Sequence, residues 1–301
     1  MHIGVPSDIK IHEYPMGLTR PPVAKLVTRG HQVTIETGAG AGLDGHLMAI
    51  MSRSARASRR GRRRRRCATG REKEPLMTPP YRIGFLLWDG LTQLDMTGPA
   101  QVLSRMPGAE LHYVWHSLAP VMSDCGLAMV PTRTFADCPP LDMICVPGGV
   151  GFVPVMRDPV VIAWLHAQAA TAQLVTSVCT GSLILAAAGL LKGYRAGCHW
   201  AAGEQLALFG AEFVKERVVI DRNRITAGGV TSGIDFAFRV LEQMHGRDMA
   251  EAVQLALEYD PAPLGGGTPA TARPELLAMV QAQMAARLAL READVAAFAT
   301  A

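Results

Sequence analysis

The sequence predicts an α/β fold: a doubly wound, mostly parallel sheet with helices on both faces, preceded by a short βαβ fragment and an Arg-rich linker. Apolar runs of strand length, such as RIGFLLW at residues 82–88, have the near-continuous hydrophobicity of strands buried on both faces. Segments with apolar residues at helical spacing alternate with these runs, and Gly- or Pro-containing turns separate them. This alternation is typical of a parallel sheet built from βαβ units.

Composition and charge bound the class of protein. The chain has 301 residues, 49% apolar and 19% charged, which is a globular composition. Eleven of its basic residues and only two acids fall within residues 52–74, whereas the other 278 residues carry 19 basic and 24 acidic side chains. The net charge of +4 therefore comes from one short segment. It is weak evidence for a nucleic-acid or anionic-membrane partner, and we expect neither.

No apolar run approaches the roughly 18 residues that a membrane-spanning helix needs, and no secretory signal is recognised at the amino terminus. Six cysteines without a Cys-x-x-Cys pair do not indicate a disulfide framework. We therefore expect a cytoplasmic protein with reduced cysteines.

The first 44 residues predict a βαβ unit at the amino terminus, with strands at residues 1–6 and 31–36 and a helix at 22–28. The text IGVPSDIKIHEYPMGLTR, followed by VTIETGAG, resembles the amino terminus of alanine dehydrogenases and transhydrogenase alpha subunits. That family carries its substrate-binding Arg where this chain has Pro15, and its dinucleotide-binding glycine fingerprint does not follow. We therefore expect a non-functional fragment and no nicotinamide cofactor.

Residues 45–76 form the Arg-rich, low-complexity segment that contains RRGRRRRR. Like-charge repulsion should keep it open. Three interpretations stay open: a solvated linker, a functional basic arm, or a seam that is not made as part of the native protein, which would then start at Met77.

The main domain is expected at residues 77–263. Asp158 and Pro159 have the residue types of an N-cap and a first helical position, and Pro99 is interpreted in the same way as a helix start. Strands are expected at residues 82–88, 110–116, 141–146, 173–178, 218–221 and 224–227, with a short hairpin or excursion at 127–130 and 133–135. Helices are expected at residues 99–106, from 159 onward, at 180–188 and at 231–245.

A carboxy-terminal linker and helix make up residues 264–301. The Gly- and Pro-rich text PAPLGGGTPATARP precedes a helix at 274–291, whose apolar stripe contains Leu277, Val280, Met284 and Leu288. We expect this helix to pack on the core or on a second subunit.

Cys179 is the strongest candidate for chemistry. In LVTSVCTGS a strand runs into a helix through a turn of small residues, which is the geometry of a nucleophile elbow. The nearby helix amino terminus is expected to favour the thiolate. Cys125, Cys138, Cys145 and Cys198 are interpreted as inert, the usual fate of buried cysteine.

Four further residues are candidates: an aspartate and two glycines at the same edge of the sheet, and a histidine. Asp95, in the loop expected after the first strand, lies between apolar neighbours, so its pKa should be raised enough to carry a proton. Gly148 and Gly149 follow the third strand and are expected to point N–H groups at a developing anion. His199 either activates the cysteine or is a structural histidine, because sequence spacing does not give the distance between the two side chains.

Taken together, the ordered motifs carry a resemblance that covers residues 81–263. LTQLDMTGPAQV, VPGGVG, VCTGS, CHW, ITAGGVTSGIDFA and LEYDPAP resemble the ThiJ/PfpI superfamily, and within it most closely the isonitrile hydratase family. The resemblance implies a flavodoxin-like, class I glutamine amidotransferase-like fold and a homodimer. It also implies Cys179 as nucleophile, Asp95 as acid/base and Thr180 as the neighbour that orients substrate or water. Asp95, where many members have Glu, favours the hydratase branch, whereas Cys198 beside His199 departs from the pattern.

The function expected from this resemblance is hydration of a small isonitrile to an N-substituted formamide, without metal or organic cofactor. The alternatives are a ligand-sensing domain, which elsewhere is followed by a helix-turn-helix module, and a redox sensor acting through Cys179.

Overall fold

The chain divides into two units, Met1–Pro75 and Leu76–Ala301, and each is described by itself. The computed structural model describes residues 2–5, 32–35 and 79–299. In the first unit, β1 (His2–Val5) and β2 (Gln32–Ile35) pair in parallel, as the sequence predicts. The expected helix at 22–28 and the Arg-rich segment lie outside the described residues.

A seven-stranded sheet forms the centre of the second unit, in the order β12-β13-β9-β8-β3-β4-β7. Neighbouring strands pair in parallel except β12 and β13, which are antiparallel around the turn at Arg222. The mostly parallel sheet that the sequence predicts is confirmed. The strands are β3 (Tyr81–Leu86), β4 (Ala109–Trp115), β7 (Arg133–Thr134), β8 (Met143–Val146), β9 (Leu174–Val178), β12 (Val218–Asp221) and β13 (Arg224–Ala227).

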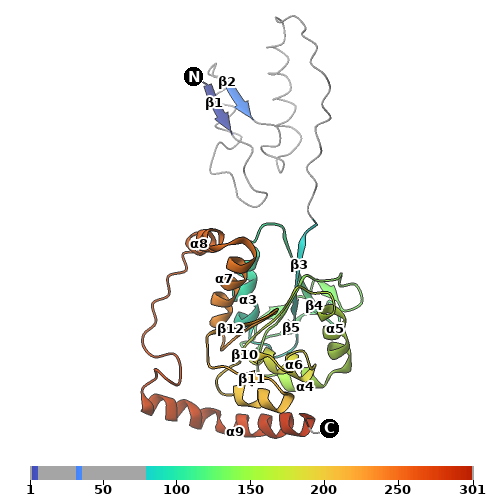
Figure 1. Ribbon diagram of the computed structural model, residues 1–301, viewed down its shortest axis with the longest axis vertical. Helices are drawn as coiled ribbons and strands as arrows, with labels where there is room; N and C mark the ends of the chain where they lie inside the picture. Colours follow the sequence, from blue (N-terminus) through green and yellow to red (C-terminus); the bar gives the residue numbers. More distant parts are fainter. Residues whose placement is uncertain (1, 6–31, 36–78, 300–301) are drawn as a thin grey trace, which may run out of the picture. The chain divides into compact units, whose positions relative to one another are not determined.

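Helices cover both faces of this sheet (Figure 1), which explains why every residue of β8 and β9 is buried. On one side α3 packs on α7, and α7 packs on α8; on the other, α4 contacts α5 and α6. The helices are α3 (Gln93–Leu103), α4 (Phe152–Arg157), α5 (Pro159–Ala169), α6 (Gly181–Ala187), α7 (Ser232–His245) and α8 (Arg247–Ala256).

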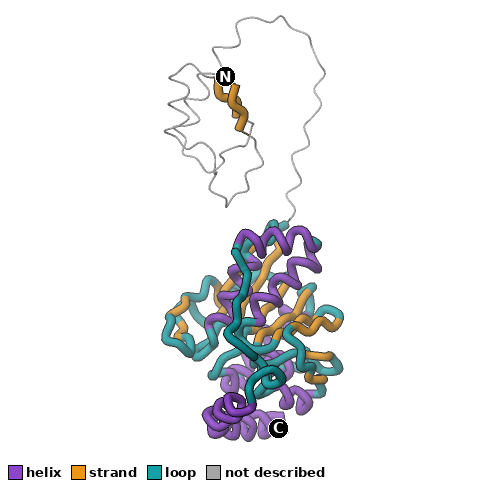
Figure 2. Tube along the Cα trace, turned by 90° about the vertical axis from the view of Figure 1, so that its left-hand side faces the viewer, coloured by secondary structure: helices purple, strands orange, loops and turns teal. Residues whose placement is uncertain are grey.

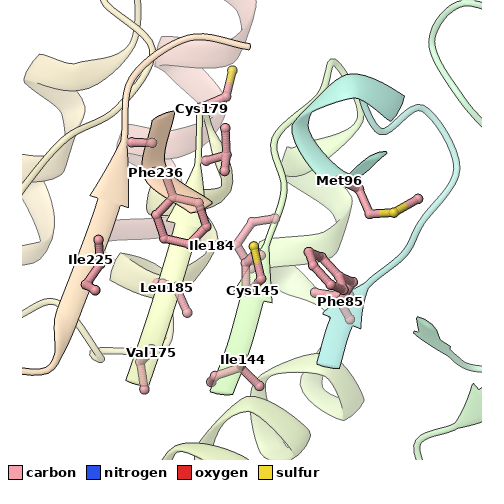
Figure 3. Packing of buried hydrophobic residues seen from close by; sticks show 14 of the residues in the cluster. Phe85, Met96, Ile144, Cys145, Val175, Cys179, Ile184, Leu185, Ile225 and Phe236 are labelled. Atoms are coloured by element: carbon pink, nitrogen blue, oxygen red, sulfur yellow. The ribbon is translucent and has the colours of Figure 1, made fainter. Parts of the chain in front are cut away.

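The core lies between these layers. Ile225 of β13, Cys145 of β8 and Phe85 of β3 lie at one level of the sheet (Figure 3), since Ile225 and Cys145 both pair with Thr176, and Phe85 pairs with Cys145. Cys179 lies past the carboxyl end of β9 in the same view. The packed strands therefore hold the residues that follow β8 and β9 in fixed positions at one edge of the sheet.

Helix α3 differs from the sequence prediction. It starts at Gln93, so Asp95 lies in its first turn and not in a loop, and Pro99 lies inside the helix and not at its start. An internal proline removes one backbone hydrogen bond. Close packing on α7 compensates for it: a β-carbon at Gly233 would lie 3.2 Å from Cδ of Pro99, and one at Gly98 would lie 3.0 Å from Ile234.

Of the two alternatives for residues 127–130 and 133–135, a short hairpin or an excursion, the hairpin is wrong. Instead, β6 (Ala128–Met129) pairs with β5 (Val121–Met122), and β7 joins the edge of the main sheet beside β4. The sequence analysis also missed α4, α8, the 3-10 helix η1 (Gly203–Phe209) and the two-residue strands β10 (Arg195–Ala196) and β11 (Glu212–Phe213).

A long connection, residues 257–273, runs along the unit from α8 to α9 (Figures 1 and 2). Helix α9 (Pro274–Ala299) extends beyond the predicted end at residue 291 and packs on η1 and α4 of its own chain. Val295 is fully buried, Phe298 lies against Phe209 with ring centroids 6.4 Å apart, and Arg157 donates to the backbone oxygen of Asp294. Among the described residues, no helix has the length and apolar composition needed to cross a membrane.

The N-cap of α5 gives a test of local stability. Asp158 accepts hydrogen bonds from the N–H groups of Val160 (2.8 Å) and Val161 (3.4 Å), as the sequence predicts. Replacing Asp158 with Ala should lower the free energy of unfolding by about 1 kcal/mol, whereas Ser, which keeps an acceptor oxygen, should lower it less. Urea denaturation measures both. Equal losses for Ala and Ser would contradict the capping role.

Candidate active site

Cys179 occupies the turn between β9 and α6 with a φ of 60°, in the left-handed region that side chains disfavour by roughly 1–2 kcal/mol. Two contacts hold this conformation: its N–H lies 3.1 Å from the carbonyl oxygen of Ala227 and 2.8 Å from that of Gly228. The next helix approaches closely because residue 181 is glycine; a β-carbon there would lie 2.0 Å from the oxygen of Val146. The side chain of Cys179 is thereby fixed at the carboxyl edge of the sheet, 5% exposed.

Asp95 projects from the first turn of α3 and is fully buried. Its Oδ2 accepts a hydrogen bond from the N–H of Gly148 at 2.9 Å. Its Oδ1 has no hydrogen-bond partner of regular geometry within the described part of the chain. A buried carboxyl oxygen without such a partner is costly, so it points to a ligand or a proton at this position.

Gly148 lies between these two side chains. A β-carbon at residue 148 would lie 2.7 Å from Cβ of Cys179 and 2.8 Å from Oδ2 of Asp95. Only glycine fits, because any side chain would push the carboxyl and the thiol apart. The structure therefore brings together the two strongest sequence candidates, from α3 and from the end of β9.

The pKa values of Asp95 and Cys179 are both raised, whereas the sequence predicts a thiolate at Cys179. Burial raises the pKa of Asp95 to about 7, although the Gly148 N–H and the Cys179 thiol act to lower it. Burial, Asp95 and Cys198 raise the pKa of Cys179 well above that of a free thiol, and the N–H groups of Thr180 and Val230 offset this only in part. The Thr180 N–H at the amino terminus of α6 lowers the pKa of Cys179, as the sequence predicts, but burial and Asp95 outweigh this effect, so the side chain is a thiol and not the expected thiolate.

The expected anion-binding role of Gly148 and Gly149 is also wrong for this structure. The N–H of Gly148 is bound to Asp95, and that of Gly149 donates to Oγ1 of Thr180 at 3.0 Å. The Thr180 hydroxyl in turn donates to the carbonyl oxygen of Gly149 at 3.2 Å. Thr180 thus fastens the loop after β8 to the cysteine turn.

His199 reaches the same pocket but is not bonded to the cysteine. Its Nδ1 accepts the N–H of Ala201 at 3.3 Å, and no hydrogen bond to Cys179 occurs among the described residues. Burial and the nearby Arg291 lower the pKa of His199. The ring is therefore neutral with its proton on Nε2, which makes it a hydrogen-bond donor in the pocket and not a base for the thiol.

A pocket of about 150 Å³ opens over Cys179 and Thr180. Its lining also includes Val150, Phe152, Gln205 and Val230 from the main domain and Met284, Arg287, Leu288 and Arg291 from α9. The predicted stripe of the carboxy-terminal helix thus contributes two members, Met284 and Leu288, to the site. The alternative that this helix packs on the core of its own chain is the one that the structure shows.

Sequence reasoning missed several of these lining residues. Val230 lies within the motif ITAGGVTSGIDFA but was not predicted as a site residue. Its backbone N–H faces the sulfur of Cys179, and its φ is 21°. Gln205 is 8% exposed with an unpartnered Oε1, on a 3-10 helix without a recognisable pattern. Arg287 and Arg291 are four residues apart and therefore lie on one face of the helix. They could have been predicted only from the polar face of this helix, whereas the prediction considered its apolar stripe.

The other four cysteines of the described residues are not part of the pocket lining. Burial raises the pKa of Cys145 and of Cys198 to about 12 and that of Cys138 to about 11, whereas Cys125 is exposed. Within the described ranges no group of three or more His, Cys, Asp or Glu side chains is placed to hold a metal ion.

The fold and the site define a class: α/β proteins with a buried cysteine in a strand-to-helix turn and a carboxyl group beside it. Residues 81–243, more than half of the chain, match the DJ-1/PfpI family, and the chain belongs to that family. The resemblance stated from the motifs is confirmed.

The chain is 50% identical to isonitrile hydratase of Pseudomonas putida over 210 residues, which cover 69% of this chain and 92% of that protein. It is 35% identical over 191 residues to the HTH-type transcriptional regulator GbdR of Pseudomonas aeruginosa, covering 60% of this chain but 51% of the regulator. A solved ThiJ/PfpI family protein from Pseudomonas syringae superposes with a TM-score of 0.70 at 38% identity, over 76% of this chain and 98% of that one.

Replacing Asp95 with Asn should stabilise the fold at pH 8. The carboxyl has a pKa of about 7 in the folded protein against about 4 in an unfolded chain, so the folded state binds this proton more tightly. Raising the pH from 4 to 7 therefore destabilises the native state through this group. Asn removes that penalty, which is on the order of 4 kcal/mol above pH 7, and keeps an acceptor for Gly148.

The measurement is the difference in unfolding free energy between variant and parent, from urea denaturation at pH 5 and pH 8. The difference should grow with pH. A difference that stays constant would show that Asp95 is not held neutral by burial.

Proposed function

We propose that this chain hydrates isonitriles to N-substituted formamides, with Cys179 as the nucleophile and Asp95 as the proton carrier. The observation that carries the proposal is the meeting of the two side chains across Gly148 at the base of a small pocket. The identity of 50% to a Pseudomonas putida isonitrile hydratase supports it.

The pocket suits a compact substrate with an apolar body. Val150, Phe152 and Leu288 supply apolar walls, and the volume of about 150 Å³ accepts a linear N≡C group with a small substituent. The terminal carbon would point toward the sulfur, because Cys179 lines the pocket whereas Asp95 lies beneath its surface.

The first step forms a thioimidate. Because its pKa is raised, Cys179 is a thiol in the resting site and needs a base. The adjacent Asp95 carboxylate accepts the S–H proton and delivers it to the terminal carbon while the sulfur bonds to that carbon. The product is Cys179–S–CH=N–R, with every atom of thiol and substrate retained.

The second step releases the formamide. Asp95, again a carboxylate, takes a proton from water as the water oxygen bonds to the thioimidate carbon, and it passes that proton to the nitrogen. The C–S bond then breaks, the hydroxyl proton of the intermediate returns to the sulfur through Asp95, and R–NH–CHO leaves. Throughout, the N–H groups of Thr180 and Val230 stabilise negative charge as it appears on the sulfur.

A second candidate function is ligand sensing, which the 35% identity to a transcriptional regulator favours. A sensor would bind its ligand without turnover. Redox sensing is less well supported, since a raised thiol pKa lowers the thiolate fraction that peroxides attack.

Replacing Cys179 with Ala should reduce formamide production from cyclohexyl isocyanide on the order of 10³-fold or more, because the covalent route is removed. Gas chromatography of the formamide gives the rate. Cys138→Ala, which removes a half-buried thiol outside the pocket lining, is the matched control and should keep the parent rate. Undiminished turnover by the Cys179 variant would refute its role.

The pH dependence follows from the carboxyl group. Only ionised Asp95 accepts the thiol proton, so kcat/KM should rise with pH through a midpoint near 7 and then level off. Rates at saturating and limiting cyclohexyl isocyanide from pH 5.5 to 9 give the profile. A rate that falls as pH rises through 7 would contradict Asp95 as the base, and Asp95→Asn should abolish the rise together with most of the activity.

A further inference from the structure

Two cationic side chains from α9 line the cysteine pocket. Arg287 and Arg291 are four residues apart and therefore lie on one face of the helix, next to each other. Met284 and Leu288, from the same helix, also line the pocket. The proposed reaction uses neither arginine, because the reacting group is neutral.

Neither arginine has an acidic partner within the described part of the chain. Several other arginines there do: Arg157 pairs with Asp294, Arg217 with Asp235 and Arg247 with Glu251. Arg291 is half-buried, and burial together with the positive charge of Arg287 lowers its pKa. Arg287 is exposed and Arg291 half-buried, so their positive charges add at the mouth of the pocket and attract an anion there.

The anion would sit within reach of the cysteine. Arg291 lies close enough to Cys179 for the charge on the sulfur to affect it, and close enough to His199 to lower the pKa of that ring. His199 is neutral and offers one more N–H donor in the pocket. The pocket is thus lined by two cations, one neutral donor and a nucleophile.

We propose that Arg287 and Arg291 bind a carboxylate group of the substrate while its isonitrile carbon meets Cys179. A planar carboxylate matches the guanidinium fork, and it is small enough for a pocket of about 150 Å³. The substrate class is then an isocyano carboxylic acid. This inference rests on the proposed function for the identity of the reacting group, but not for the anion-binding site itself.

The anion site is tested by alkylation, which needs no hydratase activity. Iodoacetate and iodoacetamide differ in charge but hardly in size, and peptide mass spectrometry gives the rate of each at every cysteine. Exposed Cys125 is the internal reference. The ratio of iodoacetate to iodoacetamide rates should be about fivefold higher at Cys179 than at Cys125, as expected for an anion paired with partly exposed cations.

Arg287→Gln and Arg291→Gln, singly and together, keep helix propensity and remove the charge. The double variant should bring the Cys179 ratio to within about twofold of the Cys125 ratio. Arg273→Gln, just before α9 and outside the pocket lining, is the matched control and should leave the ratio high. A parent ratio equal to that of Cys125, or a ratio unchanged in the double variant, would overturn the anion site.

Turnover separates the two proposals. Isocyanoacetate should have a higher kcat/KM than its neutral ethyl ester, and the double variant should reverse that order while still hydrating cyclohexyl isocyanide. Hydration of cyclohexyl isocyanide without any preference for the carboxylate would overturn this inference and leave the proposed function standing. An alkylation preference with no isonitrile hydrated would support the anion site and refute the hydratase function.

Discussion

The burial of one carboxyl group against one thiol is the constraint on which the site depends. Asp95 has no exposed surface, one hydrogen bond from Gly148 and an oxygen left without a regular partner. Such a group is costly to bury in its charged form, so the fold stabilises the protonated carboxyl up to about pH 7. That cost gives the aspartate a proton affinity near neutrality, which is the property that the proposed reaction needs.

The surrounding structure keeps this arrangement in place. A left-handed backbone at Cys179, a glycine at 148 through which the two side chains meet, and the mutual hydrogen bonds of Thr180 with Gly149 each remove freedom from the pair. Helix α9 then covers the pocket from a distant part of the sequence. The cysteine and the carboxyl group at the base come from the sheet edge and α3, whereas the cationic groups at the mouth come from the last helix. In the proposed reaction, separate elements therefore supply reactivity and substrate choice.

The sequence was most informative where local chemistry is strict. The buried strands, the Asp158 cap and the cysteine turn could all be predicted, because their residue types permit few alternatives. The position of Asp95 on a helix could not, since proline usually starts helices and only the packing of Gly98 and Pro99 against α7 permits one inside. The raised pKa of Cys179 could not be predicted either, because a helix amino terminus is visible in the sequence whereas burial beside a carboxyl group is not. The resemblance to alanine dehydrogenases at residues 1–44 stays a prediction.

The central claim, that Cys179 bonds to the substrate carbon with Asp95 carrying the proton, is tested most directly by rapid acid quench during turnover of cyclohexyl isocyanide. Mass spectrometry of the peptide that contains Cys179 should show a mass increase equal to one whole isonitrile, since thiol and substrate combine without loss of atoms. The adduct should form before the formamide and decay with its release. Formamide released at the full rate while that peptide stays unmodified at every quench time would contradict the account.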